Sequence, residues 1–85
     1  GFAVVEGRVF ATGGGGRMRY LNFAQDWRKD FTLRAERAVE RGLDRAGIGF
    51  ASLVGRRVRA RGWMIYRNGP MLHISCPQQI EAMPE

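Results

Sequence analysis

The sequence predicts a mostly β fold, a small five-stranded barrel with one helix between strands three and four. Residues 57–62 alternate arginines with Val58, Ala60 and Gly62. This pattern predicts a strand with one buried face and one solvent-exposed face. A glycine on the buried face lets strands coil tightly, as a small barrel requires. Glycine and proline breaks divide the rest of the chain into segments that follow the same fold.

Two of the predicted strands lie on either side of a run of four glycines, Gly13 to Gly16. The strands are expected over 4–12, 17–23, 31–35, 57–66 and 71–76. Their buried side chains are expected to be Val5, Val9, Ala11, Leu21, Phe23, Phe31, Leu33, Leu72 and Ile74, with Phe10, Met18, Tyr20, Asn22, Thr32 and Arg34 on the outside. Because buried residues pair with buried residues across a hairpin, the glycine loop is expected to hold an odd number of residues. A bulge at Gly7 would shift the early part of this assignment.

Over residues 36–46 the spacing of the apolar residues changes from that of a strand to that of a helix. Val39 and Leu43 recur on one helical stripe, and Gly47 supplies a stop. The opposite face carries two basic–acidic pairs at i,i+3 spacing, Arg37 with Glu40 and Arg41 with Asp44. We interpret these charges as a solvated helix face.

Three strands, a helix and two strands are the order of the OB-fold. An SH3-like barrel is the main alternative, but it does not normally place an eleven-residue amphipathic helix at this point. After Pro77 ends the last strand, Ile80 and Met83 are expected to pack the tail back onto the barrel. The chain has no repeat, low-complexity linker or second domain, so residues 1–85 are expected to form one domain.

The charge and cysteine content limit the function classes. Net charge is +6, with fourteen basic residues, all but one of them arginine, against eight acidic ones. A basic domain favours anionic partners, nucleic acid first, although heavy use of Arg, Ala and Gly is also what a GC-rich genome produces. The single Cys76 excludes an internal disulfide and a cysteine-rich metal site. We expect His73, the only histidine, to be a surface residue.

Several segments together resemble a known family. They are Val5-Glu6-Gly7-Arg8-Val9, Tyr20-Leu21-Asn22-Phe23, Asp26-Trp27-Arg28-Lys29-Asp30-Phe31, Gly55-Arg56-Arg57-Val58-Arg59-Ala60-Arg61-Gly62-Trp63 and Arg67-Asn68-Gly69-Pro70-Met71. In this order they resemble the C-terminal domain of bacterial thermonuclease-family proteins, relatives of staphylococcal nuclease. The resemblance covers nearly the whole chain and implies an accessory OB domain that follows a nuclease-like domain in the same protein.

The resemblance places catalysis elsewhere. In that family the nuclease domain carries two calcium-binding aspartates, a glutamate base and two phosphate-clamping arginines. Here Asp26 and Asp30 belong to a turn and Glu36 and Glu40 to the charged helix face, so neither pair fits that motif. We therefore expect no catalytic residue, metal or cofactor in this domain. Phosphodiester hydrolysis by the domain itself, through Asp26 and Asp30, is the weakest alternative.

A nucleic-acid site fits the pattern better. OB domains bind single strands with the face of strands two and three and with the loops that join strands one–two and four–five. The candidate residues in those regions are Arg17, Tyr20, Trp27, Arg28, Lys29, Thr32, Arg34, Arg67 and Asn68. Tyr20 offers a stacking platform, and arginines meet phosphates with bidentate geometry. Trp27 serves equally well as a cover for the barrel mouth, and Arg57, Arg59 and Arg61 are interpreted as the solvated barrel wall.

The expected partners are therefore a single-stranded nucleic acid and the nuclease-like domain of the same chain. The alternative is a domain that packs on that neighbour and binds no nucleic acid. We expect a monomer without a membrane segment, because no apolar run reaches the length of a span. The chain starts Gly-Phe-Ala without Met, which indicates a piece of a longer protein. A periplasmic or exported location is compatible with this sequence.

Overall fold

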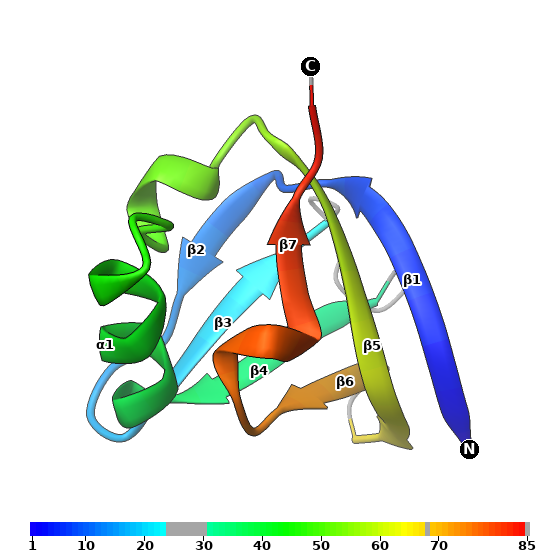
Figure 1. The fold of residues 1–85 in the computed structure, drawn as a ribbon. Coiled ribbons are helices and arrows are strands. Elements are labelled where there is room, and N and C mark those ends of the chain that lie inside the picture. Colours follow the sequence, from blue (N-terminus) through cyan, green and yellow to red (C-terminus); the bar gives the residue numbers. More distant parts are fainter. Residues whose placement is uncertain (24–30, 68, 85) are drawn as a thin grey trace.

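A curled, half-barrel sheet and one α-helix make up the computed structural model, which describes residues 1–23, 31–67 and 69–84 (Figure 1). The strands are β1 (Phe2–Arg8), β2 (Ala11–Gly13), β3 (Met18–Asn22), β4 (Thr32–Glu36), β5 (Arg57–Tyr66), β6 (Pro70–Ile74) and β7 (Ile80–Ala82). The helix α1 (Arg37–Arg45) follows β4, and two short 3-10 turns cover Ala51–Leu53 and Pro77–Gln79. The predicted mostly β class with one helix between the third and fourth expected strands is confirmed.

The strands form one sheet in the order β1-β5-β6-β4-β3-β2, with β7 added beside β5. All neighbours are antiparallel except β4 and β6, which run parallel. The parallel pair arises because the chain crosses from β4 to the β5–β6 hairpin through α1 (Figure 1). Residues from β4 and β6 that are far apart in sequence therefore become direct neighbours.

The expected first strand, 4–12, is broken into β1 and β2 at Val9 and Phe10. The N–H of Val9 still bonds the carbonyl of Arg56, the residue before β5, whereas the N–H of Phe10 bonds the carbonyl of Asn22 in β3. The chain thus changes partner between two consecutive residues. Gly7 causes no bulge, because β1 pairs with β5 residue by residue from Phe2 to Arg8.

This change of partner reverses the side-chain parity that the sequence predicted for β2. Thr12, not Ala11, lies opposite the buried Leu21. The prediction that Ala11 shares the buried face with Val9 is therefore wrong. The loop prediction is wrong for the same reason, since an even number of residues, 14–19, separates the last β2–β3 pair, Gly13 with Tyr20.

The core lies between the concave face of the sheet and α1. Its fully buried large side chains are Leu21, Leu33, Leu43, Leu53, Leu72, Ile74, Val9 and Val58. Val39 and Leu43 are the buried residues of α1, as the helical stripe predicts, and the helix packs on β3 and β4. Phe23 and Phe31 stack with ring centroids 4.2 Å apart at the margin of this core.

The C-terminal tail adds a strand that the sequence did not predict. Ile80 is buried, as expected, and starts β7, which pairs with β5 between Val58 and Ala60. The side chain of Gln79 holds the turn before β7. Its Nε2 donates to the carbonyls of Arg61 and His73, and its Oε1 accepts from the N–H groups of Ser75 and Cys76. Within the described residues, no helix has the length and apolar character needed to cross a membrane.

Candidate nucleic-acid interface

Three side chains from three neighbouring strands form one row on the outer face of the sheet. Tyr20 of β3 lies opposite Arg34 of β4, and Arg34 lies opposite His73 of β6. Nε of Arg34 donates a hydrogen bond to Nδ1 of His73 at 3.3 Å. All three residues are half-buried, so each keeps an exposed part. The row combines an aromatic ring with a cation and a polar ring, which are the groups that single-stranded nucleic-acid sites use.

The glycine loop allows Tyr20 to lie where it does. A Cβ on Gly14 would stand 2.7 Å from Cδ2 of Tyr20 and 2.6 Å from the carbonyl oxygen of Met18. Gly14 also has φ +90, a conformation that side-chain-bearing residues rarely adopt. The tyrosine ring therefore packs against bare backbone, and the loop supplies one wall of the row.

A second row lies beside the first, two residues further along the strands. It joins Asn22, Thr32 and Met71 across β3, β4 and β6. Thr32 was expected to be outside, but it is only 3% exposed, and its Oγ1 donates to Oδ1 of Asn22 at 3.4 Å. Thr32 thus lies on the predicted face of the sheet, but the expectation that it is exposed is wrong, and its hydroxyl already bonds Asn22.

Arg17 lies at the end of β3 that meets the start of α1. It lines an open pocket of about 300 Å³ together with Arg37, Arg41 and Glu36. The N–H of Arg37 bonds the carbonyl of Arg17 at 2.9 Å, and Nε of Arg37 bonds the carbonyl of Gly16 at 2.7 Å. Three arginines thus line the pocket against one glutamate. This excess of positive charge is suited to a phosphate group, which arginines bind with paired N–H donors.

Arg67 lies in the hairpin between β5 and β6, at the opposite end of the strands from Arg17. Its side chain is exposed, and its N–H bonds the carbonyl of Gly69 at 3.0 Å. The structure therefore brings Tyr20 and Arg34 together and places Arg17 and Arg67 beyond the two ends of the same face. The other predicted site residues, Trp27, Arg28, Lys29 and Asn68, lie outside the described residues.

Sequence reasoning did not include His73, Arg37 and Arg41 among the candidates. The two arginines had been interpreted as a solvated helix face, and Arg37 in fact bonds Gly16 while Glu40 pairs with Arg19 at 3.0 Å. His73 had been interpreted as a plain surface residue. The predicted OB order could have identified His73 as a candidate. In that order the fifth strand lies beside the third, which brings His73 next to Arg34.

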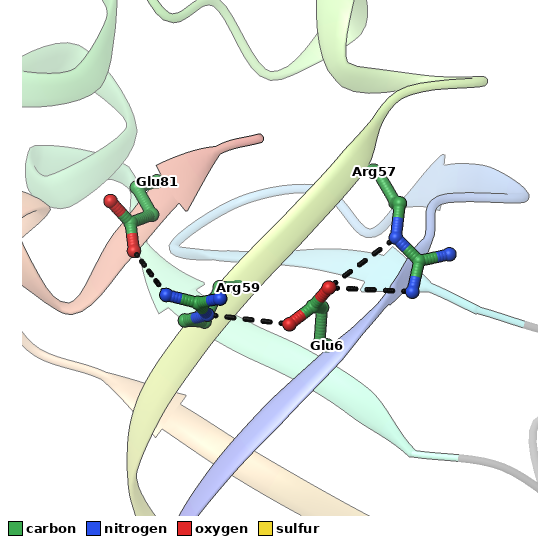
Figure 2. Close-up of polar contacts among 4 residues, drawn as sticks. All are labelled: Glu6, Arg57, Arg59 and Glu81. Atoms are coloured by element: carbon green, nitrogen blue, oxygen red, sulfur yellow. Dashed lines mark hydrogen bonds and ion pairs between the residues drawn. The ribbon is translucent and has the colours of Figure 1, made fainter. Parts of the chain in front are cut away.

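The alternating arginines of β5, Arg57, Arg59 and Arg61, lie outside the face of β3, β4 and β6. Two of them form ion pairs with neighbouring strands. Arg57 and Arg59 both bond Glu6 of β1, with closest distances of 3.3 Å, and Arg59 also reaches Glu81 of β7 at 3.6 Å (Figure 2). These ion pairs link the three adjacent strands. Arg57 and Arg59 therefore lie on the solvent-exposed outer face of the curled sheet, as predicted from the alternating pattern.

The described part of the chain holds no group of three or more His, Cys, Asp or Glu side chains that are placed to hold a metal ion. Asp26 and Asp30, the carboxylates of the weakest sequence alternative, lie outside that part. Cys76 is exposed, and its Sγ contacts Oε1 of Gln79 at 3.6 Å.

Comparisons with known proteins add no functional assignment to this surface. No protein-family model, curated protein or solved structure matches the chain.

Proposed function

We propose that this domain binds single-stranded nucleic acid with the outer face of β3, β4 and β6. In this proposal it is an accessory, non-catalytic OB-type module of a thermonuclease-like protein. The observation that carries the proposal is the row of Tyr20, Arg34 and His73, in which an aromatic residue and an arginine are direct register partners on one half-exposed surface.

The strand order supports the OB-type assignment. The path β1-β5-β6-β4-β3-β2 begins and ends with strands that only Val9 and Phe10 separate in the chain. If β1 and β2 are counted as one bent strand, the sheet has the five-strand order expected of an OB-fold, and β4 and β6 form its parallel pair. An OB barrel has this arrangement, with its ligand face on strands two and three, which correspond here to β3 and β4.

The chemistry of the surface supports a polynucleotide ligand. Base–aromatic stacking contributes about 1–3 kcal/mol per base, and it tolerates any base sequence. Arg17, Arg37 and Arg41 at one end of the face and Arg67 at the other are placed to meet phosphates. The net charge of +6 adds a general attraction to polyanions. The nuclease-like neighbour in the same protein follows from the sequence resemblance, and catalysis is assigned to that neighbour.

One observation favours the alternative, a domain that packs on its neighbour and binds no nucleic acid. Phe2, Val4 and Trp63 are all more than half exposed on the wall of β1 and β5. Apolar groups gathered on a surface mark sites of interaction.

The test is a titration of the domain with fluorescent single-stranded and duplex oligonucleotides at two salt concentrations. We expect saturable binding of single strands that weakens steeply with salt, with a slope lowered by about 0.7 for each phosphate-binding arginine removed. Y20A should lower the affinity about 5- to 150-fold through loss of stacking, and R34Q and R17Q should lower both affinity and slope.

R45Q is the matched control, because Arg45 is an exposed arginine in the last turn of α1 and its loss changes the net charge equally. If R45Q weakens binding as much as R34Q and R17Q, the charge effect is unspecific and the assigned face is wrong. If no oligonucleotide binds even at low salt, the packing domain replaces the nucleic-acid module.

A further inference from the structure

Phe2 of β1 and Trp63 of β5 form an exposed aromatic pair. They are register partners on the outer face, with ring centroids 6.0 Å apart and planes at 86°. Trp63 is 65% exposed and Phe2 is 62% exposed. An edge-to-face pair holds each ring in place while most of its surface stays in solvent. Such a pair offers an ordered ring face to a ligand.

The pair continues the row of the candidate interface. In the antiparallel β5–β6 ladder Met64 lies opposite Leu72 and Ile65 opposite Met71. One further step along this ladder sets Trp63 beside His73. The buried Gly62 lies close to β6 at the same place, since a Cβ there would be 3.1 Å from the carbonyl oxygen of His73. The outer surface therefore runs from Tyr20 through Arg34 and His73 to Trp63.

The distance between the two aromatic platforms suits a polynucleotide. Tyr20 and Trp63 are three strand spacings apart, on β3 and β5, which corresponds to about 14 Å along the sheet. OB-folds contact about 4–16 nucleotides of a single strand. One strand can therefore reach both rings, whereas a small ligand contacts only one of them.

The charge around the pair is also that of a polyanion site. On the outer face of β1, β5 and β7, four arginines, Arg8, Arg57, Arg59 and Arg61, stand against two glutamates, Glu6 and Glu81. The ion pairs drawn in Figure 2 use both glutamates. Within the described residues, the exposed guanidinium of Arg61, two positions from Trp63, makes no hydrogen bond or ion pair. An apolar protein partner would have to desolvate this charge, whereas a phosphate would pair with it.

We propose that Trp63, backed by Phe2, is a second stacking platform for the same single strand, and that Arg61 holds a phosphate beside it. The strand then crosses the sheet from Tyr20 on β3 over Arg34 and His73 to Trp63 on β5. This inference rests on the proposed function. It extends the interface to a wall that lies outside the strand two–three face.

The experiment uses the W27F variant, in which Trp63 is the only tryptophan left of the two. A dodecanucleotide should quench the fluorescence of Trp63 on binding, because a base stacks on the indole. In the unaltered background, W63L should lower dodecanucleotide affinity about 5- to 150-fold, while W63F should stay close to the parent protein. R61Q should reduce the salt slope by about 0.7. V54A is the control, because Val54 is another exposed apolar residue, located before the start of β5.

W63L separates stacking from apolar contact, because leucine keeps an apolar side chain but has no ring to stack on a base. Unchanged affinity and salt slope in W63L and R61Q, with binding weakened in Y20A, would overturn the second platform and leave the proposed function intact. In that case the aromatic pair would belong to the protein-packing alternative. Absence of oligonucleotide binding in the parent protein would overturn the proposed function as well.

Discussion

Arg34 and His73 are 39 positions apart in the chain, and the parallel β4–β6 pair joins them through a hydrogen bond of 3.3 Å from Nε to Nδ1. An imidazole nitrogen accepts a hydrogen bond only when it carries no proton, so the proton of the neutral ring lies on Nε2. The pair thus keeps two further kinds of hydrogen-bond donor, the Nε2–H of the imidazole and the terminal N–H groups of the guanidinium. A surface made of donors is suited to the acceptor oxygens of phosphates and bases.

The first prediction concerns the tautomer of His73. In the neutral imidazole we expect the Nε2–H tautomer to predominate, because Arg34 holds Nδ1 as an acceptor. Long-range proton–nitrogen correlation of the imidazole ring measures this directly. R34A should shift the ring toward a mixture of tautomers. An Nδ1–H tautomer in the parent protein would contradict the hydrogen bond.

The second prediction concerns the ion pair between Arg19 of β3 and Glu40 of α1. Nε of Arg19 lies 3.0 Å from Oε2 of Glu40, and the side chains are 23% and 15% exposed. Because Arg19 is register partner of the buried Ala35, removing Glu40 leaves a cation next to the core. We expect E40A to lower the free energy of unfolding by about 1–3 kcal/mol in urea denaturation.

A double-mutant cycle provides the control for this pair. R19M/E40A should be less destabilised than the sum of R19M and E40A, because the double variant leaves no unpaired charge. Strict additivity of the two single changes would show that the two residues do not interact.

The third prediction concerns Gly62 in the middle of β5. A Cβ at this position would lie 2.7 Å from Nε2 of Gln79 and 3.2 Å from Cδ2 of Leu72. G62A should displace the Gln79 amide from the carbonyls of Arg61 and His73 and lower stability by about 2–3 kcal/mol. G15A is the matched control, since a Cβ on Gly15 meets nothing within 4 Å. Equal midpoints of thermal unfolding for G62A and G15A would contradict this packing.

The fourth prediction concerns the exposed charges of Figure 2. Among the residues that the structure describes, Glu6 pairs with both Arg57 and Arg59, whereas Glu81 pairs with Arg59 alone. E6Q should therefore destabilise the domain by up to about 1 kcal/mol at low salt, and E81Q by less. Because exposed ion pairs are screened, both effects should vanish in 1 M salt. An E6Q effect that persists at high salt would indicate a packing role for this side chain instead.

Local patterns of the sequence were sufficient to predict most of the elements. The alternation in β5 predicted its bounds, 57–66, and its buried residues Val58 and Ala60, because a strand exposes every second side chain wherever it lies in the fold. The helical stripe identified Val39 and Leu43 for the same kind of reason. Local patterns could not predict β7, because a three-residue strand has no period of its own and exists only through its pairing with β5.

The parity of β2 shows where local reasoning fails. Val5 and Val9 follow the alternation, but the exchange of hydrogen-bond partner at Val9 and Phe10 rotates the chain before Ala11. No residue type in this segment indicates that exchange. It arises because consecutive parts of the chain pair with different strands of the curled sheet: β1 pairs with β5, and β2 pairs with β3.

By itself the sequence determined the β class, the position of the helix, most of the core, and the presence of an aromatic residue and arginines along the expected second and third strands. Only the tertiary structure decided that Thr32 is buried, that Arg19 pairs with Glu40, and that His73 completes a row with Tyr20 and Arg34. The physical reason is the range of the interactions. Periodicity indicates which side of a strand is buried, whereas the neighbour across a strand depends on how the whole sheet is ordered and curled.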